Sequence, residues 1–102
     1  MKLYLIDKYG KNYDLAKKLE KHGLDNIEIK DSCKFKLTKN DVAILVDNED
    51  IDGLSKTAKI LLLTNNKAPN YIWKFINTYN CADIIDASLD RDYITNRILS
   101  NL

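Results

Sequence analysis

Glycine is scarce in this chain, and its placement argues against one common kind of site. Only three of the 102 residues are glycine, and the stretch after the first hydrophobic run, DKYGKNY, contains one of them. Glycine-rich phosphate loops need several closely spaced glycines so that backbone N–H groups can approach the phosphates. The sequence therefore argues against dinucleotide or nucleotide triphosphate binding through such a loop.

Cysteine and histidine are also rare. Cys33 and Cys81 lie far apart, with no CxxC motif and no cluster of histidines near either of them. Metal and redox sites need such ligands at short, defined spacings. We therefore expect two reduced structural thiols and no cofactor. The one histidine, His22, falls at the end of an expected helix, where a positive charge is favourable.

Long hydrophobic runs and a strong charge imbalance are both missing. No apolar stretch approaches the roughly 20 residues that cross a bilayer, and the start, MKLYLID, lacks the features of a signal peptide. The formal net charge of +1 gives no general attraction to nucleic acid or acidic lipid. We expect a cytoplasmic protein that binds neither, with one domain over residues 1–102.

What the chain does have is a buried strand followed by acids, in the stretch DVAILVDNEDIDG. Val42 to Val46 form an unbroken apolar run, which is typical of a strand buried on both faces of a parallel sheet. Asp47, Glu49, Asp50 and Asp52 follow it. Sites in parallel sheets lie at the carboxyl ends of the strands. The acidic cluster is therefore placed where a functional site is expected.

Strand and helix patterns alternate along the whole chain. We predict strands over Lys2–Asp7, Asn26–Asp31, Val42–Val46, Lys59–Thr64 and Ala82–Ala87, with the second nearer the sheet edge. The connection over Ser32–Asn40 is a short helix or an irregular segment, and a short helix is expected from Asp52 through Lys56. This alternation predicts a flavodoxin-like α/β fold: a five-stranded parallel sheet in the order 2-1-3-4-5, with helices on both faces and the second and third helices shortened.

The remaining helices have recognisable ends and faces. Asn12 is a candidate cap for a first helix that Gly23 ends, and Pro69 is suited to start the helix over 70–80. Ser88 or Asp90 caps the last helix. Expected inward-facing residues are Tyr71, Ile72, Phe75, Ile76 and Tyr79 in one helix, and Ile94, Ile98 and Leu102 in the last; Trp73, Tyr93 and Arg97 are expected outside.

These features together resemble the receiver domains of two-component response regulators. The resemblance is carried by MKLYLIDK, by the spacing of Leu15, Leu19 and Gly23, by DVAILVD with a later DG, by LLLT, and by CADIID before a helix. It implies that Asp47 corresponds to the phosphoacceptor and Thr64 to the switch residue. Asp7 corresponds to the first acid of the pair that binds a divalent metal in receivers.

Two positions depart from the receiver pattern. Lys8 stands where receivers have their second metal-binding acid, and Ser88 stands at the position of their lysine. At about 4 Å and an effective dielectric near 20, two unit charges interact by roughly 4 kcal/mol. An ammonium in place of a ligand carboxylate therefore repels a divalent cation. If Lys8 instead turns into solvent, the repulsion is removed but a metal ligand is still missing. We expect Lys8 to pair with Asp7 and Asp47, and the five residues Asp7, Lys8, Asp47, Thr64 and Ser88 to form a degenerate phosphoacceptor pocket without metal.

The resemblance implies an atypical receiver, or pseudo-receiver, that acts as a protein-interaction module without phosphorylation and without enzymatic activity. Such modules serve in some families as N-terminal regulatory or localisation domains of larger proteins. The expected partner is a protein, including a second copy of this chain. The expected interface consists of the helix over 70–80, the last strand and the last helix, with Trp73, Tyr93 and Arg97 as contact residues.

Two alternatives stay open at this stage. A working receiver would carry a phosphoryl group on Asp47, with Asp7, Glu49 or Asp50 holding a divalent metal. A small enzyme or ligand-binding protein would use Asp7, Asp47 and Lys8 as paired acid and base groups, although the sequence indicates no substrate.

Overall fold

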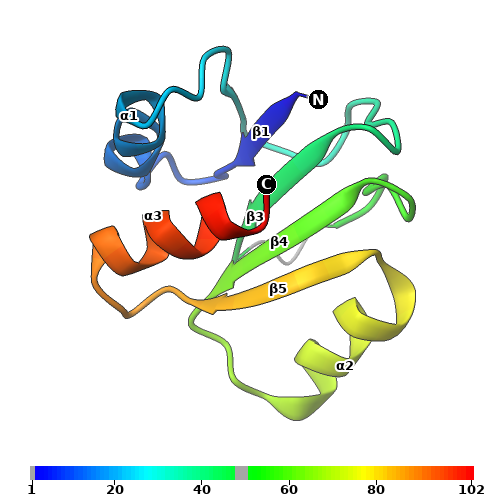
Figure 1. Ribbon diagram of the computed structural model, residues 1–102. Coiled ribbons are helices and arrows are strands. Elements are labelled where there is room, and N and C mark those ends of the chain that lie inside the picture. Colours follow the sequence, from blue (N-terminus) through cyan, green and yellow to red (C-terminus); the bar gives the residue numbers. More distant parts are fainter. Residues whose placement is uncertain (1, 48–50) are drawn as a thin grey trace.

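The computed structural model of the protein describes residues 2–47 and 51–102, and the residues within these ranges form one parallel sheet and three helices (Figure 1). Five strands lie in the order β2-β1-β3-β4-β5, which confirms the predicted flavodoxin-like arrangement. The elements are β1 (Leu3–Ile6), α1 (Tyr13–Lys21), β2 (Glu28–Lys30), β3 (Val42–Val46), β4 (Lys59–Thr64), α2 (Pro69–Thr78), β5 (Cys81–Asp86) and α3 (Arg91–Ser100).

The strand order creates a switch point between β1 and β3. Leu5 of β1 pairs with Ile29 of β2 on one side and with Ile44 of β3 on the other. The chain therefore continues from β1 to β2 on one side of it. It then crosses back over β1 to β3 and adds β4 and β5 on the other side. At such a point the loops that follow neighbouring strands diverge, and a crevice opens at their carboxyl ends.

The helices cover both faces of the sheet. Leu5, Ile44 and Leu61 belong to a core cluster with the buried residues of α1 and α3, whereas Leu45 and Leu62 pack on the opposite face with Phe75 of α2. Successive residues of a strand point to opposite faces. Because both faces of β3 and β4 are covered, every inward position there is apolar, which explains the unbroken hydrophobic runs of the sequence.

The two middle crossovers contain no helix in the residues that the structure describes. The segment from 31 to 41 is irregular, which decides between the two predicted alternatives. The helix predicted from Asp52 through Lys56 is wrong: a turn forms at Asp52 and Gly53, and Gly53 has a φ of 84°. The Ser55 hydroxyl then accepts the N–H groups of Thr57 and Ala58. Side-chain bonds of this kind compete with helix formation.

The end of α1 and the starts of α2 and α3 lie where the sequence predicted them. The N–H of Gly23 donates to the Glu20 carbonyl, and the N–H of Leu24 donates to the Leu19 carbonyl, so α1 ends in a Schellman motif. Pro69 starts α2, as predicted, and Asp90 rather than Ser88 caps α3. No helix of the described residues has the length and apolar character to span a membrane.

Helix α2 buries a narrower face than predicted. Phe75 is buried, but Ile76 is 49% exposed, so its predicted inward position is wrong. Trp73 lies off the buried face and is 58% exposed, as predicted. The helix connects β4 to the edge strand β5, and Phe75 is its one fully buried residue. In α3, Ile94 and Ile98 are buried, while Leu102, just beyond the helix, is exposed.

Candidate functional site

A cavity of about 270 Å³ lies at the switch point, at the carboxyl ends of β1 and β3. Asp7, Lys8 and Asp47 line it, so the structure brings together the three strand-end residues that the sequence singled out. Asn12 and Arg91 line it as well. Sequence reasoning assigned neither of these two to the site, and the local pattern around Arg91 carries no signal beyond its place after the cap residue Asp90.

Asp47 is held by donors from the end of the neighbouring strand. The Thr64 hydroxyl donates to Oδ1 of Asp47, and the backbone N–H of Asn65 donates to Oδ2 at 2.9 Å. Thr64 is itself buried, and its hydroxyl oxygen accepts the N–H of Asn66 at 2.8 Å. Both carboxylate oxygens of Asp47 are therefore engaged, and Asp47 and Thr64, two of the five residues expected in the pocket, contact each other.

Asp7 is buried, with 4% of its surface exposed, and it is satisfied by a single residue. The backbone N–H of Asn12 donates to Oδ2 at 2.8 Å, and the Asn12 side-chain amide donates to Oδ1 at 3.2 Å. The Asn12 side chain makes no capping bond to α1, although it occupies the cap position. The predicted capping role is wrong because a buried carboxylate requires donors, and Asn12 supplies them.

The ion pair that the sequence predicted for Lys8 does not form. Lys8 is exposed, and its ammonium lies 5.5 Å from the centre of the Tyr9 ring rather than against Asp7 or Asp47. An exposed lysine loses little by staying in water, because its ammonium is strongly hydrated and its stem is flexible. Lys11 also lines the cavity, with its ammonium 6.0 Å from the centre of the same ring. Arg91 is the lining cation that is hydrogen-bonded to another lining residue: its Nη1 donates to Oδ1 of Asn12 at 2.7 Å.

Ser88 lies outside the pocket, where Ala87 takes the lining position. The Ser88 hydroxyl donates to Asp86 at 2.6 Å and its backbone N–H donates at 2.9 Å. Lys67 forms an ion pair with the same carboxylate at 3.0 Å. These bonds, those from Ser88 first, lower the pKa of Asp86 to about 2. Ser88 therefore organises the turn after β5 instead of facing Asp47.

The residues present do not fit the divalent metal of a receiver. Within residues 2–47 and 51–102, no three acids, cysteines or histidines gather in one place. Asp7 and Asp47 each accept two bonds from protein donors, and Arg91 brings positive charge to the same cavity. Magnesium needs several free oxygen ligands in near-octahedral array. Glu49 and Asp50, the other candidate ligands, lie outside the described residues.

The three candidate interface residues lie on α2 and α3, and they differ in exposure and in the contacts that they make within the chain. Trp73 of α2 is 58% exposed and Tyr93 of α3 is 45% exposed. Arg97 is engaged: its Nε donates to Asp83 at 2.9 Å, and its Nη1 donates to the Tyr93 hydroxyl at 2.9 Å. The hydrogen bond to Asp83 raises the pKa of Arg97 above its usual range.

The two flanks of α2 have different surroundings. Asn70 and Lys74, four residues apart, line a second cavity of about 590 Å³ together with Tyr71 and Phe75. Trp73 and Ile76, three residues apart, lie side by side elsewhere on the helix and are exposed. An exposed apolar strip of Trp73 and Ile76 therefore runs along α2, away from the cavity. The sequence missed Ile76 as a surface residue because it fits the hydrophobic period.

At the open edge of the sheet, one backbone N–H group of β5 is hydrogen-bonded to a side chain of the same strand. The N–H of Ala87 donates to the Thr64 carbonyl of β4, so alternate residues of β5 face the sheet. Ile84 belongs to the other set, and its N–H donates to Oδ1 of Asp83 at 2.9 Å. This outward-facing N–H is therefore not free to pair with another strand.

Comparisons with protein-family models, with curated proteins and with solved structures found no match.

Proposed function

We propose that this chain is an atypical receiver-like module that binds a protein partner, a second copy of itself included, without needing phosphorylation. Its role would be regulation or localisation, as part of a larger protein or alone. The proposal builds on the flavodoxin-like strand order, on the receiver-like positions Asp7, Asp47 and Thr64, and on the way in which the acids at the switch point are already occupied.

The observation that carries the proposal is the double engagement of Asp47. A phosphoacceptor needs a carboxylate oxygen free to attack phosphorus and a metal to neutralise the charge on the phosphoryl group. Here Thr64 and Asn65 each occupy one oxygen of Asp47. Asp7 is held by Asn12 in the same way. Such bonds favour the resting carboxylates over phosphorylated or metal-bound forms.

The exposed strip on α2 supports an interaction role. Trp73 and Ile76 are 58% and 49% exposed, and Tyr93 adds a third large exposed side chain on α3. Tryptophan and tyrosine are enriched among the residues that contribute most to protein interfaces. Arg97, also expected at the interface, would act by orienting Tyr93 through its bond to the phenol.

A working receiver is the second candidate, and one observation favours it. Asp7 and Asp47 line the same cavity, and Thr64 contacts Asp47, which keeps a phosphoacceptor and its switch residue together. For phosphorylation, an oxygen of Asp47 would have to bond to phosphorus through a lone pair that Thr64 or Asn65 does not use, while the donor's leaving group departs. The metal would need ligands beyond Asp7 and Asp47.

Beryllofluoride with magnesium, a mimic of a phosphoryl group, separates the two candidates. We expect no change in the melting temperature of the protein on adding both, because the carboxylates of Asp7 and Asp47 already accept hydrogen bonds from protein donors, which disfavours binding of magnesium and of the mimic. Asp47→Asn is the control. A stabilisation that requires magnesium and disappears in Asp47→Asn would establish the working receiver and reject the interaction module that is independent of phosphorylation.

Self-association is tested by light scattering over a concentration series. We expect the apparent mass to rise towards that of a dimer, and Trp73→Ala and Ile76→Ser each to shift the rise to higher concentration. The matched control is Lys74→Ala, on the flank of α2 that lines the second cavity. A monomer at every concentration would remove the second copy as partner, and an equal effect of Lys74→Ala would remove the strip as the interface.

A further inference from the structure

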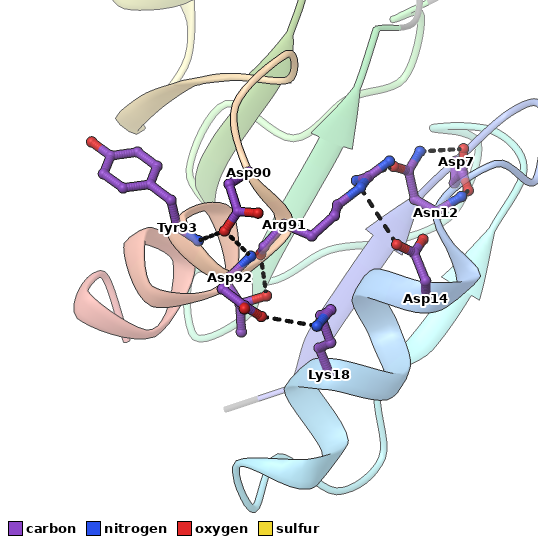
Figure 2. A network of polar contacts seen from close by, with 9 residues as sticks. Asp7, Asn12, Asp14, Lys18, Asp90, Arg91, Asp92 and Tyr93 are labelled. Carbon is purple, nitrogen blue, oxygen red and sulfur yellow. Dashed lines mark hydrogen bonds and ion pairs between the residues drawn. The ribbon is translucent and has the colours of Figure 1, made fainter.

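The side-chain amide of Asn12 lies between the acidic Asp7 and the basic Arg91 and forms a hydrogen bond with each (Figure 2). Its amide N–H donates to Asp7 at 3.2 Å, and its amide oxygen accepts from Arg91 at 2.7 Å. Arginine has only donors, and an ionised carboxylate only accepts, so the amide fits in one orientation. The three groups form a polarised chain from guanidinium to carboxylate, in which each bond strengthens the next.

Arg91 is also anchored on its other side. Its Nε lies 3.4 Å from Oδ2 of Asp14 in α1, and the neighbouring Asp92 accepts from Lys18 of α1 at 2.8 Å. Figure 2 shows these contacts joining the first turn of α3 to α1 and to the end of β1. Because Arg91 has partners on both α1 and the loop before it, its charge has a fixed position at the switch-point cavity.

We propose that Arg91, acting through Asn12, is the resident cation of this pocket and that it keeps the pocket closed to divalent metal. The inference rests on the proposed function and deepens it, because it names the residue that makes the site independent of metal. The sequence indicated Lys8 as the residue that excludes metal. Lys8 opposes metal binding less strongly than Arg91, because its exposed side chain can move into water when a cation approaches.

Two physical effects give Arg91 this role. A fixed positive charge at the cavity repels a dication directly, and burial of the neighbouring Asp7 weakens the screening by water. The relay also holds the amide of Asn12 on Asp7, so a metal would have to displace that bond before it could bind the carboxylate.

The test restores the missing acid and then removes the arginine. Lys8→Asp gives the pocket the second strand-end carboxylate, and the double variant Lys8→Asp with Arg91→Gln removes the guanidinium charge while keeping a hydrogen-bonding side chain. Mn²⁺ binding is followed by calorimetry and by the paramagnetic loss of the amide NMR signals near Asp7 and Asp47. We expect the double variant to bind Mn²⁺ about tenfold more tightly than Lys8→Asp alone.

Two further variants control for charge and for general loosening of α3. Lys8→Asp with Arg91→Lys keeps a cation and is expected to bind Mn²⁺ no more tightly than Lys8→Asp. Lys8→Asp with Arg97→Gln removes an arginine of the same helix that pairs with Asp83 and does not line the cavity, and is expected to behave likewise. Thermal melts and amide spectra without metal establish that each variant is folded.

Equal Mn²⁺ affinity in Lys8→Asp with and without Arg91→Gln would overturn the inference, and so would an equal gain from Arg97→Gln. That failure is distinct from failure of the proposed function. If the unaltered protein were stabilised by beryllofluoride and magnesium, the proposed function would fall whatever Arg91 does. If it were not, and Arg91→Gln still brought no gain, only the assignment to Arg91 would fall.

Discussion

The guanidinium of Arg97 on α3 is held by the carboxylate of Asp83 on β5, with Nε donating to Oδ2 at 2.9 Å and Nη2 contacting Oδ1. Asn101 donates to the same carboxylate at 2.8 Å. This arrangement joins the last helix to the edge strand. It also means that Arg97 serves its own chain first, and that Tyr93, which accepts from Arg97, is the residue presented at this surface.

Replacing Asp83 with asparagine is expected to lower stability. An amide keeps the shape of the carboxylate but weakens the charge-assisted bonds from Arg97, which are worth roughly 1.5–3 kcal/mol in stability. We expect the free energy of unfolding, measured in urea at pH 7, to fall by about 1–2 kcal/mol. Asp92→Asn is the control, since its pair with Lys18 is exposed to water and should contribute little to stability. Equal losses in both variants would contradict this reading.

Asp86 is expected to make stability depend on pH in the acid range. Its bonds from Ser88, with the ion pair to Lys67, lower its pKa to about 2, below the value of about 3.9 for an unfolded aspartate. Its contribution to stability is therefore complete above about pH 4 and is lost as the pH falls towards about 2. Ser88→Ala should raise the pKa of Asp86, as followed by NMR titration of the carboxyl carbon. An unchanged titration would exclude Ser88 as the main cause.

Thr64 is expected to tolerate loss of its methyl group better than loss of its hydroxyl. The hydroxyl donates to Asp47 and accepts from Asn66, and the residue is buried. Thr64→Val leaves these groups without their partner, at a cost of about 1–3 kcal/mol in unfolding free energy. Thr64→Ser keeps both bonds and should cost less. Chemical denaturation measures both variants, and a serine variant as unstable as the valine variant would show that packing of the methyl group dominates.

Substitution of Gly23 is expected to lower stability because of the backbone conformation of this residue, and not because of steric contacts. Its φ of 89° is unfavourable for residues with a Cβ, yet an added Cβ would meet nothing within 4 Å. Gly23→Ala should therefore lower the free energy of unfolding by about 1 kcal/mol, and Gly23→Asn by less, because asparagine adopts this conformation more readily. Thermal melts of the two variants check the order. An alanine variant as stable as the parent would contradict a strained C-terminal turn at α1.

The sheet was predictable because its central strands are buried on both faces, so Val42–Val46 and the run 60–63 inside β4 are apolar without interruption. The absence of the short helix expected from Asp52 through Lys56 was not predictable. Gly53 adopts a left-handed conformation, and the Ser55 hydroxyl takes backbone N–H groups that a helix would use. Both effects depend on local geometry that periodicity does not contain.

The site was only half predictable. The strand ends placed Asp7 and Asp47 at one edge, since parallel strands finish side by side. The partners of these acids could not be read in the same way. Arg91 is 79 positions from Asn12 in the chain, and the choice between Lys8 and Arg91 depends on which side chain has a fixed path to the pocket. Ile76 was misplaced because helical spacing does not reveal how narrow the buried face of α2 is, with Phe75 as its one buried residue.

The bond from the Ile84 N–H to Asp83 has a consequence for how copies of the protein can meet. Strand-by-strand growth, the route by which exposed sheet edges lead to fibrils, needs an uninterrupted row of free amides along the outermost strand. In this chain, the Ile84 amide of that row is already hydrogen-bonded to Asp83 of the same strand. Pairing of another strand with β5 would first have to break this bond, so growth into an open-ended polymer along this edge is disfavoured.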